Sequence, residues 1–191
     1  TFEVGTAFFQ DCATFESTIY PANLDALIYA AKTARTPYLA PGGPDVLDLV
    51  LSPASVVTGK PAELIATIDD THYRQTNGVE PAQAIAAAEY TIDTPPWAAG
   101  AVGHAMAAAD GSLDSHAEDV VASVDTAGLA PGRHILFVRG RDASGAWGVI
   151  SAIFLEVGRG SEESLLFIPY VRAEDLAGTR ISPDFSHLPL K

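Results

Sequence analysis

A series of short apolar runs separated by turn residues constrains the fold of this 191-residue chain more than any other feature. Six runs alternate apolar with polar residues or are rich in β-branched ones: 46–52, 62–69, 87–93, 119–125, 134–142 and 148–157. A weaker run lies near 103–109. Short strands at this spacing are typical of antiparallel sandwiches. We therefore expect a mainly β fold over residues 44–157.

Turn-forming residues between the runs support the same architecture. They lie at Thr58-Gly59-Lys60, Asp110-Gly111, Ala130-Pro131-Gly132 and Ser144-Gly145. The pattern favours an immunoglobulin-like or fibronectin type III-like sandwich. It lacks the paired cysteines of antibody domains, since the chain has one cysteine, Cys12. We expect Trp97 and Trp147 to pack in the core of the sandwich or at its ends.

Residues 1–43 have a different pattern. The opening "TFEVGTAFF" predicts a strand, and residues 20–38 predict a helix that begins with Asn23 as N-cap and ends at Pro37. The apolar residues of this helix recur at helical spacing on one face: Leu24, Leu27, Ile28 and Ala31. One strand and one helix cannot bury both of their apolar faces in each other. We therefore interpret residues 1–43 as the end of another domain.

Residues 158–191 open with a polar spacer, "GRGSEES". Pro169 then restricts the following apolar stretch to an edge strand or an extended segment. We interpret these residues as a C-terminal extension.

Charge and hydropathy exclude several classes of partner. The chain carries 24 acidic and 11 basic residues, a net charge of −13. Phosphate binding needs clustered Lys and Arg, so no nucleic acid is expected as a partner. An anionic membrane surface is disfavoured for the same reason. No stretch approaches the roughly 20 apolar residues of a membrane-spanning helix, so we expect no membrane span.

Few side chains are candidates for metal binding or catalysis. None of the five histidines forms a close-spaced metal-ligand pair, so a zinc site built from this chain alone is not expected. His134 alternates with the apolar residues of its run, which favours a structural role. Glu3 lies between Phe2 and Val4. It either faces solvent from the alternating side of its strand, or is buried and therefore paired, protonated or catalytic.

A resemblance to a known family bears on Glu3. The segment "TFEVGTAFFQDCATFESTIYPANLDALIYAAKTARTPYL" is similar to the C-terminal end of the catalytic domain of zinc carboxypeptidases of the carboxypeptidase A/T-like type. In that family a late strand with a "TFE" motif presents the catalytic glutamate, and a closing helix follows. Residues 43–157, with "IAAAEYTIDTPPW" and "VRGRDASGAWGVISAIFLEV", resemble the immunoglobulin-like accessory domain that follows in secreted bacterial members.

The resemblance implies a function for the parent protein. Glu3 would be the general base, and residues 1–43 would be a strand-plus-helix remnant of an α/β carboxypeptidase domain. The zinc ligands, the substrate-binding arginine and the tyrosine over the cleft would all lie upstream. The expected protein is a secreted enzyme that removes C-terminal amino acids from peptide or protein substrates. This chain alone would bind no cofactor and be inactive.

Two questions stay open at the level of sequence. The alternative function is a non-catalytic secreted or cell-surface immunoglobulin-like module for binding or adhesion, with the long segment 69–84 as its candidate contact surface. Cys12 is either a small buried apolar side chain or half of a disulfide whose partner lies upstream.

Overall fold

The computed structural model describes residues 5, 7, 9–37, 39–71 and 81–159. All of them lie within the first of the two units into which the chain divides, Thr1–Gly160. No helix among these residues is long and apolar enough to span a membrane.

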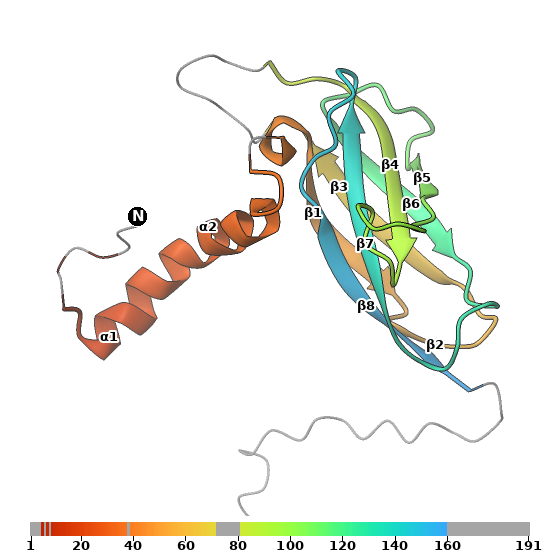
Figure 1. Ribbon diagram of the computed structural model, residues 1–191, viewed down its shortest axis with the longest axis horizontal. Coiled ribbons are helices and arrows are strands. Elements are labelled where there is room, and N and C mark those ends of the chain that lie inside the picture. The colour runs from red at the N-terminus through yellow and green to blue at the C-terminus, as the bar shows by residue number, and fades with distance from the viewer. Residues whose placement is uncertain (1–4, 6, 8, 38, 72–80, 160–191) are drawn as a thin grey trace, which may run out of the picture. The chain divides into compact units, whose positions relative to one another are not determined.

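The described residues form eight β-strands (Figure 1). In chain order they are β1 (Asp45–Ser52), β2 (Ser55–Val57), β3 (Ala62–Asp69), β4 (Ile85–Ile92), β5 (His104–Ala108), β6 (Ala117–Val124), β7 (Gly132–Asp142) and β8 (Ser151–Gly158). The hydrogen-bonded order is β1-β3-β6-β5-β4-β7-β8-β2. Every neighbouring pair is antiparallel except β2 and β8, which are parallel.

Strand β5 divides this order into two layers. Its residues 104–106 pair with β4, and Ala107 and Ala108 pair with β6. One layer is therefore β1-β3-β6 and the other β4-β7-β8-β2, with β5 passing between them. If β2 is taken as the second half of the first strand, the strand order of each layer is that of the immunoglobulin fold. The fold is thus the mainly β, immunoglobulin-like antiparallel sandwich that the sequence predicts.

The core lies between the two layers and follows from the two-residue period of a strand. Side chains at alternate positions are fully buried, and they come from both layers: Leu64, Ile68, Val120, Val124, Leu136, Val138 and Leu155. Successive residues of a strand point to opposite faces, so one face of each layer packs against the core and the other faces outward. Burial of each such side chain contributes roughly 1.5–3 kcal/mol.

The edges of the sheet are short or irregular. Strand β1 shifts its register between Leu47 and Val50, where Asp48 adopts a φ of 47°. The chain leaves the first layer at the cis Ser52–Pro53 peptide and continues as β2 beside β8. The sequence pattern missed β2, because three residues are too few to show an alternation.

The last predicted strand begins later than expected, at Ser151 instead of residue 148. Residues 143–147 form a hairpin turn, and Gly148 follows it against the backbone of Pro44. A Cβ at Gly148 would overlap the Pro44 carbonyl oxygen, so this position requires glycine.

The helical region begins earlier than the sequence predicts. It comprises α1 (Cys12–Thr14), a π-helical turn η1 (Phe15–Ile19) and α2 (Tyr20–Thr33). The N-cap is Asp11, whose carboxylate accepts a 2.8 Å hydrogen bond from the Thr14 amide. The expectation that Asn23 caps the helix was wrong, because its side-chain amide lies inside the helix and donates to the Ile19 carbonyl at 2.7 Å.

Pro21 explains this error. A proline inside a helix lacks an amide donor, and its ring clashes with the carbonyl four residues earlier. The π-helical turn just before Pro21 widens the helix at that point, so the helix continues through the proline. The regular helix then ends at Thr33, four residues before Pro37.

Candidate functional site

The outward face of strand β7 carries the first components of a candidate site. His134, Leu136 and Val138 are buried, and the alternate residues Phe137, Arg139 and Arg141 are only partly buried. Glu89 of β4 is paired in register with Arg139. The Arg139 Nε and Nη2 atoms donate to its Oε1 atom at 2.8 and 2.6 Å.

The hairpin after β7 brings Trp147 over these arginines. The Asp142 carboxylate accepts hydrogen bonds from the Ser144 hydroxyl at 2.8 Å and from the Ala146 amide at 2.9 Å. Gly145 supplies the left-handed residue that the turn needs, with a φ of 95°. The guanidinium carbons of Arg139 and Arg141 lie 3.9 and 5.4 Å from the centroid of the Trp147 ring. Both geometries are cation–π contacts.

Trp97 forms a second aromatic wall. It lies in the connection from β4 to β5, after Pro95 and Pro96, and the Pro95 carbonyl accepts a hydrogen bond from the Ala98 amide. Its ring meets Phe137 edge-on, with centroids 6.4 Å apart. The Arg35 guanidinium lies 4.9 Å from the same ring.

The end of helix α2 lies against this face. The Lys32 Nζ atom donates to the Ser151 hydroxyl at 2.8 Å, and that hydroxyl donates to the Val46 carbonyl at 3.0 Å. Arg35 follows in the next turn, and Leu39 lies just before the short 3-10 helix η2 (Ala40–Gly42). Residues distant in sequence therefore meet where the chain passes from the helix into the sandwich.

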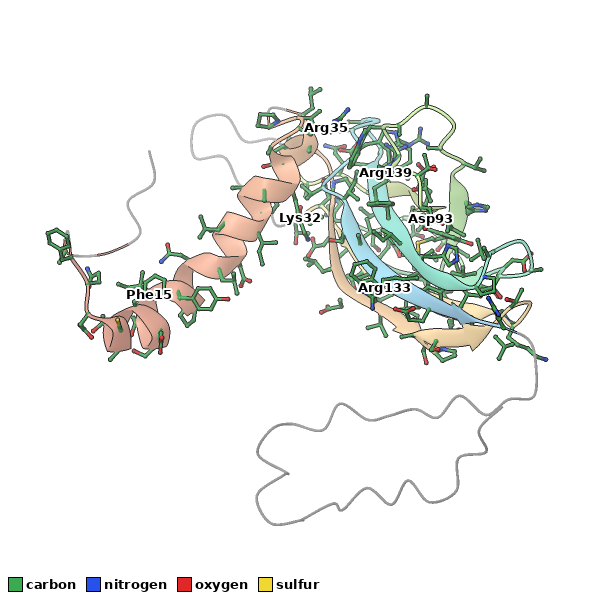
Figure 2. All side chains as sticks on the ribbon, turned by 60° about the horizontal axis from the view of Figure 1, so that its bottom comes forward. Phe15, Lys32, Arg35, Asp93, Arg133 and Arg139 are labelled. Atoms are coloured by element: carbon green, nitrogen blue, oxygen red, sulfur yellow. The ribbon has the colours of Figure 1, made fainter. Side chains whose placement is uncertain are left out.

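Together these residues enclose a cleft of about 370 Å³, which we call the Trp–Arg cleft. Its principal lining residues are Arg35, Leu39, Trp97, Arg139, Trp147 and Ile150. Figure 2 shows Arg35 and Arg139 close to each other, and both line the cleft. Its floor and walls are mainly apolar, and its cations belong to a chain with a net charge of −13.

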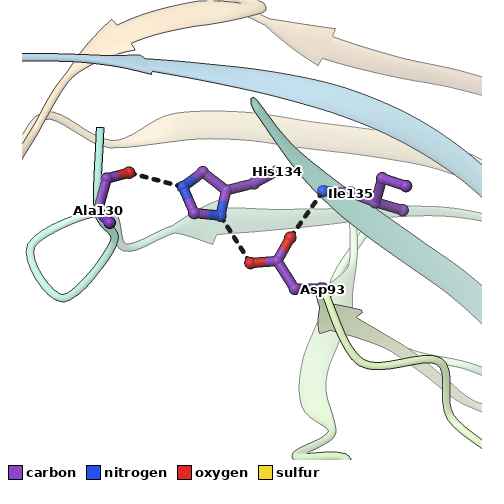
Figure 3. A network of polar contacts seen from close by, with 4 residues as sticks. All are labelled: Asp93, Ala130, His134 and Ile135. Atoms are coloured by element: carbon purple, nitrogen blue, oxygen red, sulfur yellow. Dashed lines mark hydrogen bonds and ion pairs between the residues drawn. The ribbon is translucent and has the colours of Figure 1, made fainter. Parts of the chain in front are cut away.

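A polar network links His134 of β7 to Asp93, just after β4 (Figure 3). The ring nitrogens of His134 lie 2.7 Å from the Asp93 carboxylate and 2.7 Å from the Ala130 carbonyl oxygen. The other Asp93 oxygen accepts from the Ile135 amide at 3.0 Å. Two acceptors facing one ring favour the imidazolium, in which both nitrogens donate.

The pKa values of the pair shift in opposite directions. The Ala130 carbonyl raises the pKa of His134, burial opposes this, and the Asp93 carboxylate raises it further. For Asp93, partial burial acts to raise the pKa, but the hydrogen bonds from His134 and Ile135 and the charge of His134 outweigh it and lower the pKa. Both ring nitrogens are engaged, so the structural role that the sequence suggests for His134 agrees with its contacts.

The sequence-based site predictions have different outcomes. Glu3, the predicted catalytic base, lies outside the described residues, as does most of the candidate contact segment 69–84. Cys12 is an exposed free thiol, so its interpretation as a buried apolar side chain was wrong. Within the described ranges no group of three or more His, Cys, Asp or Glu side chains could hold a metal ion.

Sequence reasoning missed the Trp–Arg cleft. Of the two positions expected for Trp97 and Trp147, the core was wrong: Trp97 is 50 % exposed, Trp147 is partly buried, and both line the cleft from segments that follow strands β4 and β7. A signal was present, because Arg139 and Arg141 alternate with small or apolar residues in "FVRGRD". On a strand whose other face is buried, that alternation places both arginines on the outside.

Comparisons with known proteins give little further information. No protein-family model matches the chain, and no curated protein is similar to it in sequence. Among solved structures it is similar to OgpA from Akkermansia muciniphila (14 % identity, TM-score 0.40, 59 % of this chain and 27 % of that one).

It is also similar to the DNA glycosylase AlkC from Pseudomonas fluorescens (16 % identity, TM-score 0.38, 73 % of this chain and 36 % of that one). A third similar structure is that of the fibronectin(III)-like modules of CbhA from Clostridium thermocellum (14 % identity, TM-score 0.32, 61 % of this chain and 100 % of that one). The chain thus spans about a quarter of OgpA and about a third of AlkC. With TM-scores below 0.5, none of these similarities indicates a function for this chain.

Proposed function

We propose that this chain is the C-terminal part of a secreted zinc carboxypeptidase, in which the sandwich is an accessory domain joined to the closing helix of the catalytic domain. The proposal originates in the resemblance of residues 1–40 and 43–157 to that family. In it, Glu3 is the general base, and the zinc ligands are supplied by upstream sequence.

One structural observation supports the proposal most directly: the helix exposes an apolar surface. Four of its large apolar side chains are between 44 and 48 % exposed, namely Phe15, Tyr20, Leu27 and Ile28, whereas Ile19 is buried and Leu24 is partly buried. Leu27 and Ile28 belong to the face on which apolar residues recur at helical spacing. Most helical stability in proteins comes from packing of such a face. The helix therefore has the surface expected of an element that belongs to a larger domain.

The test uses protein expressed from the whole reading frame that contains this sequence. We would measure the release of C-terminal amino acids from a peptide, together with the zinc content. Loss of a positioned general base costs about 10²–10⁴-fold in rate. Glu3→Gln should therefore abolish most activity while zinc content is unchanged. Glu16→Gln, which alters an exposed glutamate of the helical region, is the matched control and should retain both.

Two results would overturn the proposal. One is a Glu3→Gln protein as active as the parent, and the other is a parent protein that contains no zinc and releases no amino acid.

The alternative is a non-catalytic secreted or cell-surface binding module. The observation in its favour is the Trp–Arg cleft, where Trp97 is half exposed beside the cationic Arg35. Under this alternative, removal of residues 1–31, which leaves Lys32, Arg35 and the sandwich in place, should destabilise the sandwich, because those residues would be part of one folding unit with it. Under the carboxypeptidase proposal the melting temperature of the sandwich should be nearly unchanged.

A further inference from the structure

We propose that the Trp–Arg cleft binds a short acidic segment of a second polypeptide, in which one aromatic or large aliphatic side chain is flanked by carboxylates. This inference does not depend on the carboxypeptidase proposal, because it rests on residues of the sandwich and of the connection that precedes it.

The cleft is suited to one large apolar side chain. Its volume of about 370 Å³ lies within the usual range of small-ligand sites. Trp97 and Leu39 on its rim are 50 and 72 % exposed, so apolar surface remains in water there. Covering this surface with an apolar side chain is favourable by roughly 25 cal/mol for each Å² removed from water. Tryptophan and arginine are also the residues most enriched where binding energy concentrates.

Among the described residues, the cation of the cleft without a carboxylate partner is Arg35. Arg139 is already paired with Glu89, whereas Arg35 has a ring contact with Trp97 and no ion pair among the described residues. Guanidinium groups bind carboxylates through directed hydrogen bonds. No carboxylate of the described residues pairs with Arg35, so this guanidinium group can receive an anionic ligand.

The charge of the whole chain makes this site distinctive and limits what can occupy it. A net charge of −13 repels anions from most of the surface, so an acidic segment has few favourable positions. A nucleic acid would need a longer track of cations than this face provides. A short acidic peptide with one apolar side chain can fill the cavity with that side chain and pair a carboxylate with the Arg35 guanidinium group.

The chain contains its own fluorescent reporter for the test. Its two tryptophans, Trp97 and Trp147, both line the cleft, so intrinsic fluorescence of the 191-residue chain reports on its occupancy. The probe is the peptide acetyl-Asp-Glu-Phe-Glu-Asp-amide, which lacks tryptophan. The matched comparison is acetyl-Lys-Lys-Phe-Lys-Lys-amide. We expect a saturable fluorescence change with the acidic peptide that weakens as salt is raised, and none with the basic peptide.

Charge reversal gives the sharpest variant. Arg35→Gln should weaken binding of the acidic peptide roughly fivefold, as expected for one exposed ion pair. Arg35→Glu should abolish it and allow the basic peptide to bind instead. Trp97→Ala should weaken binding more than about tenfold through loss of the aromatic wall. Binding to this variant is measured by calorimetry, because the substitution removes one of the two fluorescent side chains. Lys60→Gln, an exposed cation away from the cleft lining, is the control and should bind as the parent does.

Any of three results would overturn the inference: no saturable binding of the acidic peptide, equal binding of both peptides, or binding that Arg35→Glu leaves unchanged. Because the assay needs neither zinc nor peptidase activity, its failure would leave the carboxypeptidase proposal standing, and the reverse holds as well.

Discussion

Leucine is found in contrasting environments in the two regions of this molecule. Leu136 of strand β7 is 0 % exposed, whereas Leu27 of helix α2 is 48 % exposed. The sandwich buries its apolar side chains between its own two layers, and the helix leaves much of its apolar face in water. In the sandwich the apolar face of each layer is therefore part of a complete core. In the helix the apolar face is a surface without a described partner.

The largest effect should separate these two leucines directly. Leu136→Ala removes buried methyl groups and leaves a cavity, so we expect it to lower the free energy of unfolding by about 2–5 kcal/mol. Leu27→Ala, the same change at an exposed helical site, should shift it by less than about 0.5 kcal/mol. Denaturant unfolding of the two variants measures both values. Equal losses would mean that the helix and the sandwich share one core.

A backbone contact at the junction should give the next largest effect. Gly148→Ala places a Cβ against the Pro44 carbonyl, so we expect a destabilisation of roughly 1–3 kcal/mol, as for other overpacked sites. Gly128→Ala is the matched control, because a Cβ there meets no atom within 4 Å. Thermal unfolding compares the two. If both variants melt alike, the close approach of Gly148 and Pro44 contributes nothing to stability.

The His134–Asp93 pair should give a smaller, pH-dependent effect within the sandwich. The pKa of His134 is raised above 6.5, so its contribution is complete below that pH and is lost as pH rises through the raised value. The pKa of Asp93 is lowered below 3.8, so its contribution is complete above that pH and is lost as pH falls through the lowered value. The pair should stabilise the fold most between about pH 4 and 6.5.

The amplitude should stay under about 1 kcal/mol, because the Asp93 side chain is 49 % exposed. Unfolding at a series of pH values measures it. Asp93→Asn keeps a residue that tolerates the positive φ of 58° but removes the charge. The Asp93 part of the pH dependence should therefore disappear, and the His134 part should shrink to what the Ala130 carbonyl maintains. A variant with the same pH profile as the parent would mean that other groups are responsible.

The smallest effect should come from removing the helix itself. Deletion of residues 1–31 leaves Lys32, Arg35 and the sandwich in place, so we expect the sandwich to unfold within about 0.5 kcal/mol of the parent value. Calorimetry of the truncated chain measures this. A large loss of stability would favour the binding-module alternative, in which helix and sandwich are one unit.

Much of the sandwich could be predicted because strand periodicity and burial are local properties. The run at 62–69 coincides with β3, and the other main runs overlap β1, β4, β6, β7 and β8. The Trp–Arg cleft could not be predicted in the same way. It forms only when the end of α2, the connection that carries Trp97 and the hairpin that carries Trp147 meet, and no local pattern specifies that meeting. The N-cap at Asp11 was missed because a helix is not expected to continue through Pro21, and the π-helical turn that allows it to do so shows no local sequence pattern.

The division of the first strand into β1 and β2 has a consequence for solubility. These two segments are the terminal strands of the sheet order, so between them they form both ends of the described sheet. One edge is interrupted at Asp48 and the other is only three residues long. Such edges are poor templates for another chain. A single interrupted strand thus protects both layers against edge-to-edge aggregation, and the negative charge of the chain adds a repulsion between copies.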